Sequence, residues 1–236
     1  MCEMLYLRKN EPFMLAEVLP YGLVLDRFGL TGFGWGVAWV KDGQITHYRS
    51  ELSLAEDRHG QIQLGDVEAD ACLFHLRRPS FLSTIAVRNT QPYLKDEAFA
   101  FGHNGYLADS TKWRDELKEL LVGESDSEIG FVKYQGYLAA GYSRVDALTK
   151  TVDDTLGDGT ANVIAMHKDG SAVATGRNHM NRLWQFRGLG FEGVVTEVHS
   201  PDGTLFQKFF PWMNGLKQIT GAVEVASQPM VATNTD

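Results

Sequence analysis

The order of its apolar patterns predicts that this 236-residue chain folds as an α+β protein. Short apolar runs typical of strands occupy the first hundred residues, helical spacing begins after residue 109, and strand-like runs return from residue 162. Strands followed by helices and then by strands form separate layers, whereas a parallel sheet requires strands and helices in alternation. We therefore expect a single layered domain over residues 2–226, followed by a loose polar tail over 227–236.

Composition and charge exclude several classes of protein. Apolar residues make up 44% of the chain and charged residues 22%, which is typical of globular proteins with a packed core. A net charge of −8 argues against a protein that binds the phosphate backbone of nucleic acids. The apolar runs are strand-sized, so no membrane span is expected, and charged residues interrupt the region where a signal peptide would lie. The two cysteines, Cys2 and Cys72, exclude a disulfide-stapled scaffold, and we expect a reducing, cytoplasmic location.

Most of the elements expected in the first half are strands. The exception is residues 12–19, where Pro12 is expected to open a short helix and Pro20 to end it. A turn at residues 41–43 is expected to join two strands as a hairpin. The expected strands are 2–7, 37–40, 45–48, 71–76 and 98–102.

Helices are expected next, between residues 110 and 152. The first carries Trp113 on its apolar face and begins at a cap formed by Ser110 or Thr111. The second covers 126–140 and starts with a capping-box pattern, Ser125 and Glu128. A third is indicated over 145–152. The returning strands are expected at 162–167, 171–175, 182–187, 192–198 and 217–226.

Cys2 stands directly behind the initiator methionine. Small second residues permit removal of Met1, which would leave Cys2 with a free α-amine. That amine titrates near ~7.7–8.0 and can act as the base for the thiol of the same residue, so no catalytic histidine is needed. On position alone, an incidental small apolar residue is the favoured interpretation, and other motifs have to decide.

Three further motifs carry groups that a small charged substrate would need, although each also has an ordinary structural explanation. Arg77 could bind a carboxylate or form a surface ion pair, and its neighbour Arg78 should point the other way, so that at most one faces a site. The Asn104 amide and the Gly105 backbone N–H could form an oxyanion hole, or simply an Asn-Gly turn. Asp126 could receive an ammonium group or merely interact with the helix dipole.

Six motifs, taken together, carry more weight than any one of them. In chain order they are Cys2, Gly34-Trp35-Gly36, His75-x-Arg77, Asn89-x-Gln91-Pro92-Tyr93, His103-Asn104-Gly105 and Ser125-Asp126-Ser127-Glu128. In combination they resemble the class-II glutamine amidotransferases, whose glutaminase domain belongs to the N-terminal-nucleophile hydrolases. The resemblance covers about residues 2–130 and is closest to the stand-alone members, which carry no attached synthase domain.

The resemblance implies a four-layer αββα sandwich and a role for each site residue. Cys2 would attack the side-chain amide of glutamine, with Asn104 and Gly105 as the oxyanion hole. Arg77 would hold the substrate α-carboxylate and Asp126 its α-ammonium group. A γ-glutamyl thioester would form, ammonia would leave, and water would regenerate the thiol.

The resemblance further implies a glutamine-like amide as substrate and leaves two roles open: supplying ammonia to a separate ammonia-using synthase as partner, or hydrolysing a γ-glutamyl amide itself. No cofactor is expected, and the seven histidines show no metal-ligand spacing. His103 is expected to shape a turn rather than to perform chemistry. The polar run of residues 177–182 has no assignment.

Three departures from the family pattern concern the substrate more than the chemistry. Phe33 stands where many relatives have Asp, Ser125 replaces a usual Thr, and Arg78 adds a second positive charge that would suit a larger or more anionic substrate. Two alternatives stay open: an N-terminal-cysteine acylase acting on another amide, and a catalytically silent regulatory or scaffolding relative. The pair of Arg77 and Asp126 argues against the first, and the full set of site residues against the second.

Overall fold

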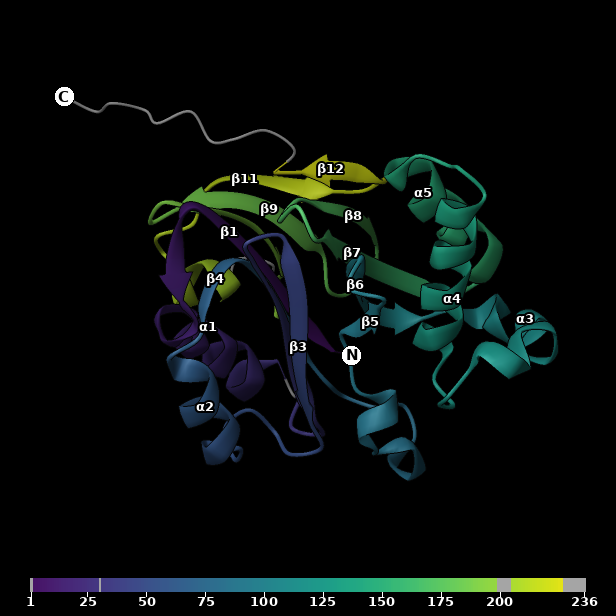
Figure 1. Ribbon diagram of the computed structural model, residues 1–236, viewed down its shortest axis with the longest axis horizontal. Coiled ribbons are helices and arrows are strands. Elements are labelled where there is room, and N and C mark those ends of the chain that lie inside the picture. Colours follow the sequence, from purple (N-terminus) through teal and green to yellow (C-terminus); the bar gives the residue numbers. More distant parts are fainter. Residues whose placement is uncertain (1, 30, 199–204, 227–236) are drawn as a thin grey trace.

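Two antiparallel sheets lie face to face in the computed structural model, which describes residues 2–29, 31–198 and 205–226 (Figure 1). The first sheet has seven strands in the order β11-β9-β10-β1-β4-β2-β3, and the second has five in the order β12-β8-β7-β6-β5. Helices α1 and α2 cover the outer face of the first sheet, and α4 and α5 cover that of the second. The expected four-layer αββα sandwich is confirmed.

The bounds of the elements follow the chain in this order. The strands are β1 Glu3–Met14, β2 Trp35–Lys41, β3 Gln44–Ser50, β4 Glu68–Leu76, β5 Tyr93–Lys95, β6 Phe99–Tyr106, β7 Thr160–His167, β8 Ala172–Arg177, β9 Leu183–Gly188, β10 Phe191–Thr196, β11 Asn214–Ile219 and β12 Val223–Val225. The helices are α1 Leu15–Phe28, α2 Arg58–Gly65, α3 Thr111–Leu117, α4 Asp126–Ala139, α5 Arg144–Thr155 and α6 Leu205–Phe209.

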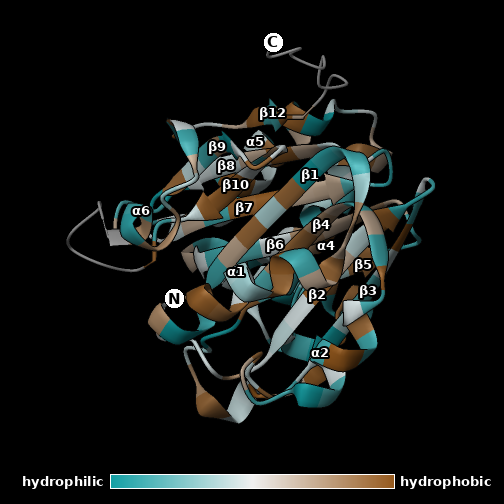
Figure 2. Cartoon of the chain, turned by 90° about the vertical axis from the view of Figure 1, so that its left-hand side faces the viewer, coloured by the Kyte–Doolittle hydropathy of each residue, from teal (hydrophilic) through white to brown (hydrophobic). Residues whose placement is uncertain are grey.

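Three apolar clusters hold the four layers together, one at each interface. Alternate residues of β1 show how a strand serves two of them: Leu5 and Leu7 pack toward α1, whereas Met4 and Tyr6 pack between the sheets. The third cluster joins β6 and β7 to α4 and α5. Figure 2 shows the hydrophobic stretches running along strands of both sheets. Burial on both faces explains why these strands read as nearly continuous apolar runs.

The expected helix over 12–19 is wrong at both ends. Residue 12 still belongs to β1, whose pairing with β4 shifts register between Arg8 and Phe13, so that Pro12 falls where the ladder is irregular. The helix α1 begins only at Leu15 and continues through Pro20 to Phe28. Proline in a helix costs about 3 kcal/mol, and the buried apolar face of α1 outweighs that cost.

Other expectations were closer to the structure. The hairpin of β2 and β3 is confirmed, with Asp42 and Gly43 at positive φ in the turn. The strand expected at 217–226 is divided between β11 and β12, which belong to different sheets. The loose tail expected at 227–236 lies outside the described residues. Within the described ranges, no helix combines the length and apolar character needed to cross a membrane.

Candidate functional site

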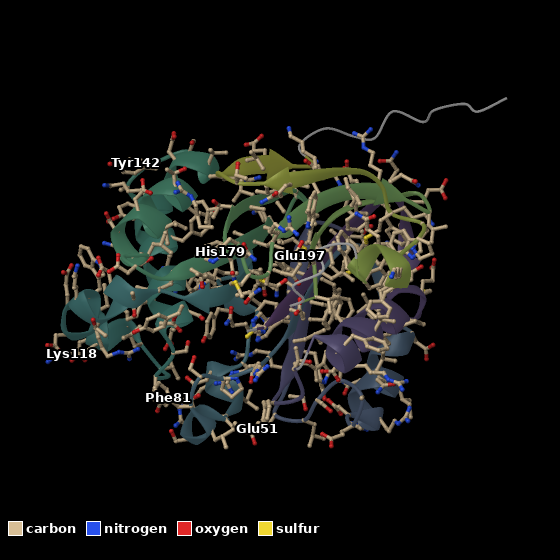
Figure 3. All side chains as sticks on the ribbon, turned by 180° about the vertical axis from the view of Figure 1, so that it is seen from behind. Glu51, Phe81, Lys118, Tyr142, His179 and Glu197 are labelled. Carbon is tan, nitrogen blue, oxygen red and sulfur yellow. The ribbon has the colours of Figure 1, made fainter. Side chains whose placement is uncertain are left out.

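A cavity of about 240 Å³ opens where the start of β1, the ends of β4 and β6, and the first turn of α4 meet. Pockets for drug-sized ligands span roughly 300–1,000 Å³, so this cavity suits a molecule of amino-acid size. Four of the five residues singled out from the sequence line it: Cys2, Arg77, Gly105 and Asp126. Phe81 forms part of its rim, is 71% exposed, and lies at the edge of the molecule in Figure 3.

Cys2 immediately precedes β1 and lines the cavity. Two and four residues further on, Met4 and Tyr6 face the space between the sheets. The Cys2 thiol sulfur accepts a hydrogen bond from the backbone N–H of Arg78 at 3.3 Å. Burial nevertheless raises the pKa of the Cys2 thiol above its usual value. A thiol with a raised pKa is protonated at neutral pH, so its use as a nucleophile requires a nearby base.

Arg77 follows β4 and is 5% exposed. Its Nη2 donates to the carbonyl oxygen and to the hydroxyl of Thr84, both at 2.9 Å. Its Nη1 is buried and makes no hydrogen bond within the described residues. A buried guanidinium nitrogen without a partner is costly, and a ligand carboxylate would satisfy it with a charge-assisted bond. Nothing in the sequence singled out Thr84, which lies in a 3₁₀ turn, as the residue that holds this arginine.

The expectation that at most one of the two arginines faces the site is wrong, because both line the cavity. It assumed that the strand continues, whereas β4 ends at Leu76 and its alternation ends there. Arg78 contributes its backbone to Cys2 while its side chain is exposed. The mouth of the cavity therefore carries a cationic side chain that is accessible from solvent.

Asn104 and Gly105 lie within β6, so the alternative of a simple Asn-Gly turn is wrong, and so is the turn-shaping role expected for His103. Gly105 has φ +145°, and a Cβ there would lie 1.9 Å from the carbonyl oxygen of Thr160, so the close approach of β7 requires glycine. The Asn104 side chain is fully buried, does not line the cavity, and has no hydrogen-bond partner for either polar atom within the described residues. Unsatisfied polar atoms of a buried amide are costly, and no group within the described residues offsets that cost.

Asp126 occupies the first turn of α4, where one carboxylate oxygen accepts from the backbone N–H of Leu107 at 2.7 Å. The capping box expected here forms only in part. The Ser125 hydroxyl accepts from the Glu128 N–H at 3.2 Å. The Glu128 carboxylate, however, accepts from the N–H groups of Val122 and Gly123 and not from the backbone N–H of Ser125, as a capping box requires. This second contact fixes the loop before α4 and with it the position of Asp126.

Two polar residues of the Asn89-x-Gln91 motif connect the walls of the cavity. Asn89 donates to the carboxylate of Glu124 at 2.7 Å and accepts from its N–H at 2.8 Å. Gln91 pairs with the backbone of His103, donating to its carbonyl at 3.3 Å and accepting from its N–H at 2.6 Å. Both motif residues are therefore structural supports of the site.

Comparison with protein families identifies the group to which this site belongs. The family model described as class-II glutamine amidotransferases matches residues 1–188. The chain belongs to this family. Comparison with curated proteins gives no match.

Solved structures share the fold of this amidotransferase at low sequence identity. Glutamine phosphoribosylpyrophosphate amidotransferase from B. subtilis matches with a TM-score of 0.73 and 15% identity over 95% of this chain and 49% of its own. A structure of the allosteric regulatory enzyme of purine biosynthesis gives 0.72 and 14% identity over 95% of this chain and 48% of its own. The chain thus spans about half the length of both. A class-II domain protein from Silicibacter pomeroyi gives 0.62 and 18% identity over 95% of this chain and 98% of its own.

Two buried histidines of this amidotransferase border the site. Burial lowers the pKa of His75 to about 3, and it also lowers the pKa of His103. The His75 Nε2 donates to the carbonyl oxygen of His103 at 3.1 Å, whereas its Nδ1 has no partner within the described residues. Both rings are therefore neutral at pH 7, and protonating His75 would place a charge in the protein interior.

We expect His75 to make the folded state less stable as the pH falls. An unfolded histidine titrates near ~6.5, so its contribution is complete above that pH and is lost progressively toward pH 3. Between pH 7 and pH 5 the loss from this residue amounts to about 2 kcal/mol. Urea unfolding of a His75→Gln variant at both values should show a pH-dependent loss smaller by that amount. Exposed His59→Gln serves as the control, and an equal effect of both substitutions would contradict the assignment to burial.

Proposed function

We propose that this amidotransferase hydrolyses the side-chain amide of glutamine, or of a γ-glutamyl amide, through a thioester on Cys2. The observation that carries the proposal is the shared cavity, which is lined by a thiol, a carboxylate and a buried guanidinium and is of amino-acid size. One nitrogen of that guanidinium has no hydrogen-bond partner in the part of the chain that the structure describes. An amino acid with a side-chain amide offers a matching carboxylate, ammonium group and electrophilic carbon. An acylase acting on a plain acyl group would need neither Arg77 nor Asp126.

Removal of Met1 first frees the α-amine of Cys2, and the first half-reaction can then take place. The amine takes the thiol proton, and the thiolate attacks the amide carbon. The Asn104 side chain and the Gly105 N–H donate to the oxygen that becomes negative. When the C–N bond breaks, the amide nitrogen takes the proton from the α-ammonium group of Cys2 and leaves as ammonia. A γ-glutamyl thioester remains.

Water completes the reaction by the same route. The α-amine removes a proton from water, the resulting hydroxide adds to the thioester carbon, and the same oxyanion hole stabilises the second tetrahedral intermediate. Its collapse releases glutamate and the thiolate, which recovers its proton. Throughout, Arg77 holds the α-carboxylate and Asp126 the α-ammonium group. The raised pKa of the Cys2 thiol supports the need for a base within the same residue.

The proposal extends to the fate of the ammonia and to the substrate. We propose that a separate synthase uses the ammonia and that the protein works in a reducing, cytoplasmic setting, in keeping with two free thiols at Cys2 and Cys72. The exposed side chain of Arg78 at the cavity mouth favours a substrate that continues beyond glutamine or carries additional negative charge.

A diazo-ketone analogue of L-glutamine tests the proposal through the intact mass of the protein. We expect a single adduct on a chain that lacks Met1, because the analogue alkylates a thiol only when the pocket holds its amino-acid end beside it. L-glutamine should protect and D-glutamine should not. The buried second cysteine provides the control: Cys72→Ala should still be labelled. A processed chain that never reacts would exclude a glutamine-shaped site, and a chain that retains Met1 would exclude the α-amine as the base.

A further inference from the structure

The connection between β8 and β9 passes from one sheet to the other beside the nucleophile. β8 belongs to the five-stranded sheet and β9 to the seven-stranded sheet, so residues 178–182 bridge the two layers. His179, labelled in Figure 3, is exposed in this segment, but Asn181 is fully buried. Within the described residues its side-chain oxygen has no hydrogen-bond partner, whereas its side-chain nitrogen has specific ones.

Those partners include Cys2 itself. The Asn181 side-chain nitrogen donates to the backbone carbonyl oxygen of Cys2 at 3.3 Å and to the two carboxylate oxygens of Glu3 at 3.1 and 3.2 Å. The carbonyl oxygen of Cys2 can only accept, which determines which way the amide faces, because the reversed amide would present oxygen to oxygen. The orientation of Asn181 is therefore set by the nucleophile and by the residue after it.

The backbone of Asn181 also contacts the five-stranded sheet. The backbone carbonyl of Asn181 accepts from the side chain of Asn162 at 2.5 Å, and Asn162 lies opposite Asn104 in the ladder of β6 and β7. Glu3 is also held, since its carboxylate accepts from the hydroxyl of Thr196 on β10. A continuous set of buried polar contacts thus connects Cys2 with the strand that pairs with the predicted oxyanion hole.

Cys2 needs such a contact because it lies outside the sheet ladder. β1 starts at Glu3, which pairs with Leu76, and the residue before a first strand tends to fray. A nucleophile misplaced by about 1 Å can lose on the order of 100-fold in rate.

We propose that Asn181 is a positioning residue that holds the Cys2 backbone so that the thiol faces the bound amide. This inference rests on the proposed function. Asn181 does not line the cavity, so it acts on the nucleophile and not on substrate binding. Its loss should lower the maximal rate and leave the half-saturating concentration unchanged.

The first test is Asn181→Asp, which keeps the shape but removes the donor. We expect the maximal rate of labelling by the diazo-ketone analogue, and kcat for ammonia release, to fall 10- to 100-fold, with the half-saturating concentration changed less than twofold. The thermal midpoint should also fall, because a carboxylate now faces Glu3. His179→Asn, in the same segment but exposed, is the matched control and should behave like the wild type.

The second test separates positioning from simple structural support. In the double variant Glu3→Gln with Asn181→Asp, the pair exchanges donor and acceptor, so Gln at position 3 donates to Asp at position 181 and still accepts from Thr196. We expect the thermal midpoint to recover. The rate should stay at least 10-fold low, because neither oxygen of Asp can donate to the Cys2 carbonyl.

The outcomes distinguish this inference from the proposed function. Recovery of both midpoint and rate in the double variant, or an unchanged rate in Asn181→Asp, would leave the proposed function standing and overturn the positioning role. A wild-type protein that is neither labelled nor active would overturn both. A raised half-saturating concentration with unchanged kcat would mean that Asn181 contributes to substrate binding and does not position the nucleophile.

Discussion

Cys2→Ala should release no measurable ammonia from glutamine, with kcat reduced by about 10⁴-fold or more. The reason is that alanine keeps the α-amine but has no atom that can form the thioester. Because Cys2 lies before the first strand and is only partly buried, we expect the thermal midpoint to stay within a few degrees of the wild type. Continuous detection of ammonia, together with a thermal melt of the same sample, measures both quantities.

Cys72→Ala is the matched control for this experiment. Cys72 is fully buried in the cluster between the first sheet and α1, so alanine there removes packing at a cost of about 1 kcal/mol and leaves turnover unaffected. If Cys2→Ala kept its turnover while Cys72→Ala lost it, the nucleophile would have been assigned to the wrong cysteine. Full turnover in both variants would exclude thiol chemistry altogether.

Asn104→Leu should reduce kcat by about 10²–10³-fold and have little effect on KM, because the oxyanion develops only during the reaction. The same substitution should not lower the thermal midpoint and is expected to raise it. Both polar atoms of Asn104 are buried and have no partner among the residues that the structure describes, and an unsatisfied buried amide costs about 1–3 kcal/mol that leucine of similar shape avoids. We therefore expect kcat to fall in steady-state kinetics while the midpoint of the thermal melt rises.

A combined loss of kcat and stability would contradict this prediction. It would mean that the Asn104 amide supports the fold of β6 and that its free atoms in the unliganded protein have no catalytic purpose. Unchanged kcat would move the stabilisation of the oxyanion to the Gly105 N–H alone, which no side-chain substitution removes.

Local signals predicted the elements that depend on neighbouring residues. The turn at residues 41–43 contains Asp42 and Gly43, both able to take positive φ, and the hairpin around it formed as expected. The helix α4 likewise starts where Ser125 provides a cap. By contrast, α2 was missed because only Gly60 and Leu64 of its eight residues are buried, so its apolar pattern is too weak to detect.

Contacts between residues far apart in the chain explain the predictions that were wrong or missing. Asn104 and Gly105 have the composition of a turn, but pairing of β6 with β7 overrides it, and that pairing involves residues more than fifty positions away. For the site, the order of six motifs identified four residues that line the cavity. Asn181 could not be recognised, because its contact with Cys2 joins residues 179 positions apart.

The strand order has a consequence for how the protein is made. Of the described strands, β1 is translated first, yet it occupies the middle of its sheet, between β4 and β10, and Leu5 pairs with Val195. At typical synthesis rates β10 emerges roughly 10–40 s later. During that interval β1 lacks its neighbour on one side, and its sheet stays incomplete. Late translation of β10 therefore delays completion of the sheet whose strand β1 follows Cys2, so the surroundings of that residue are completed only after residues 191–196 have been made.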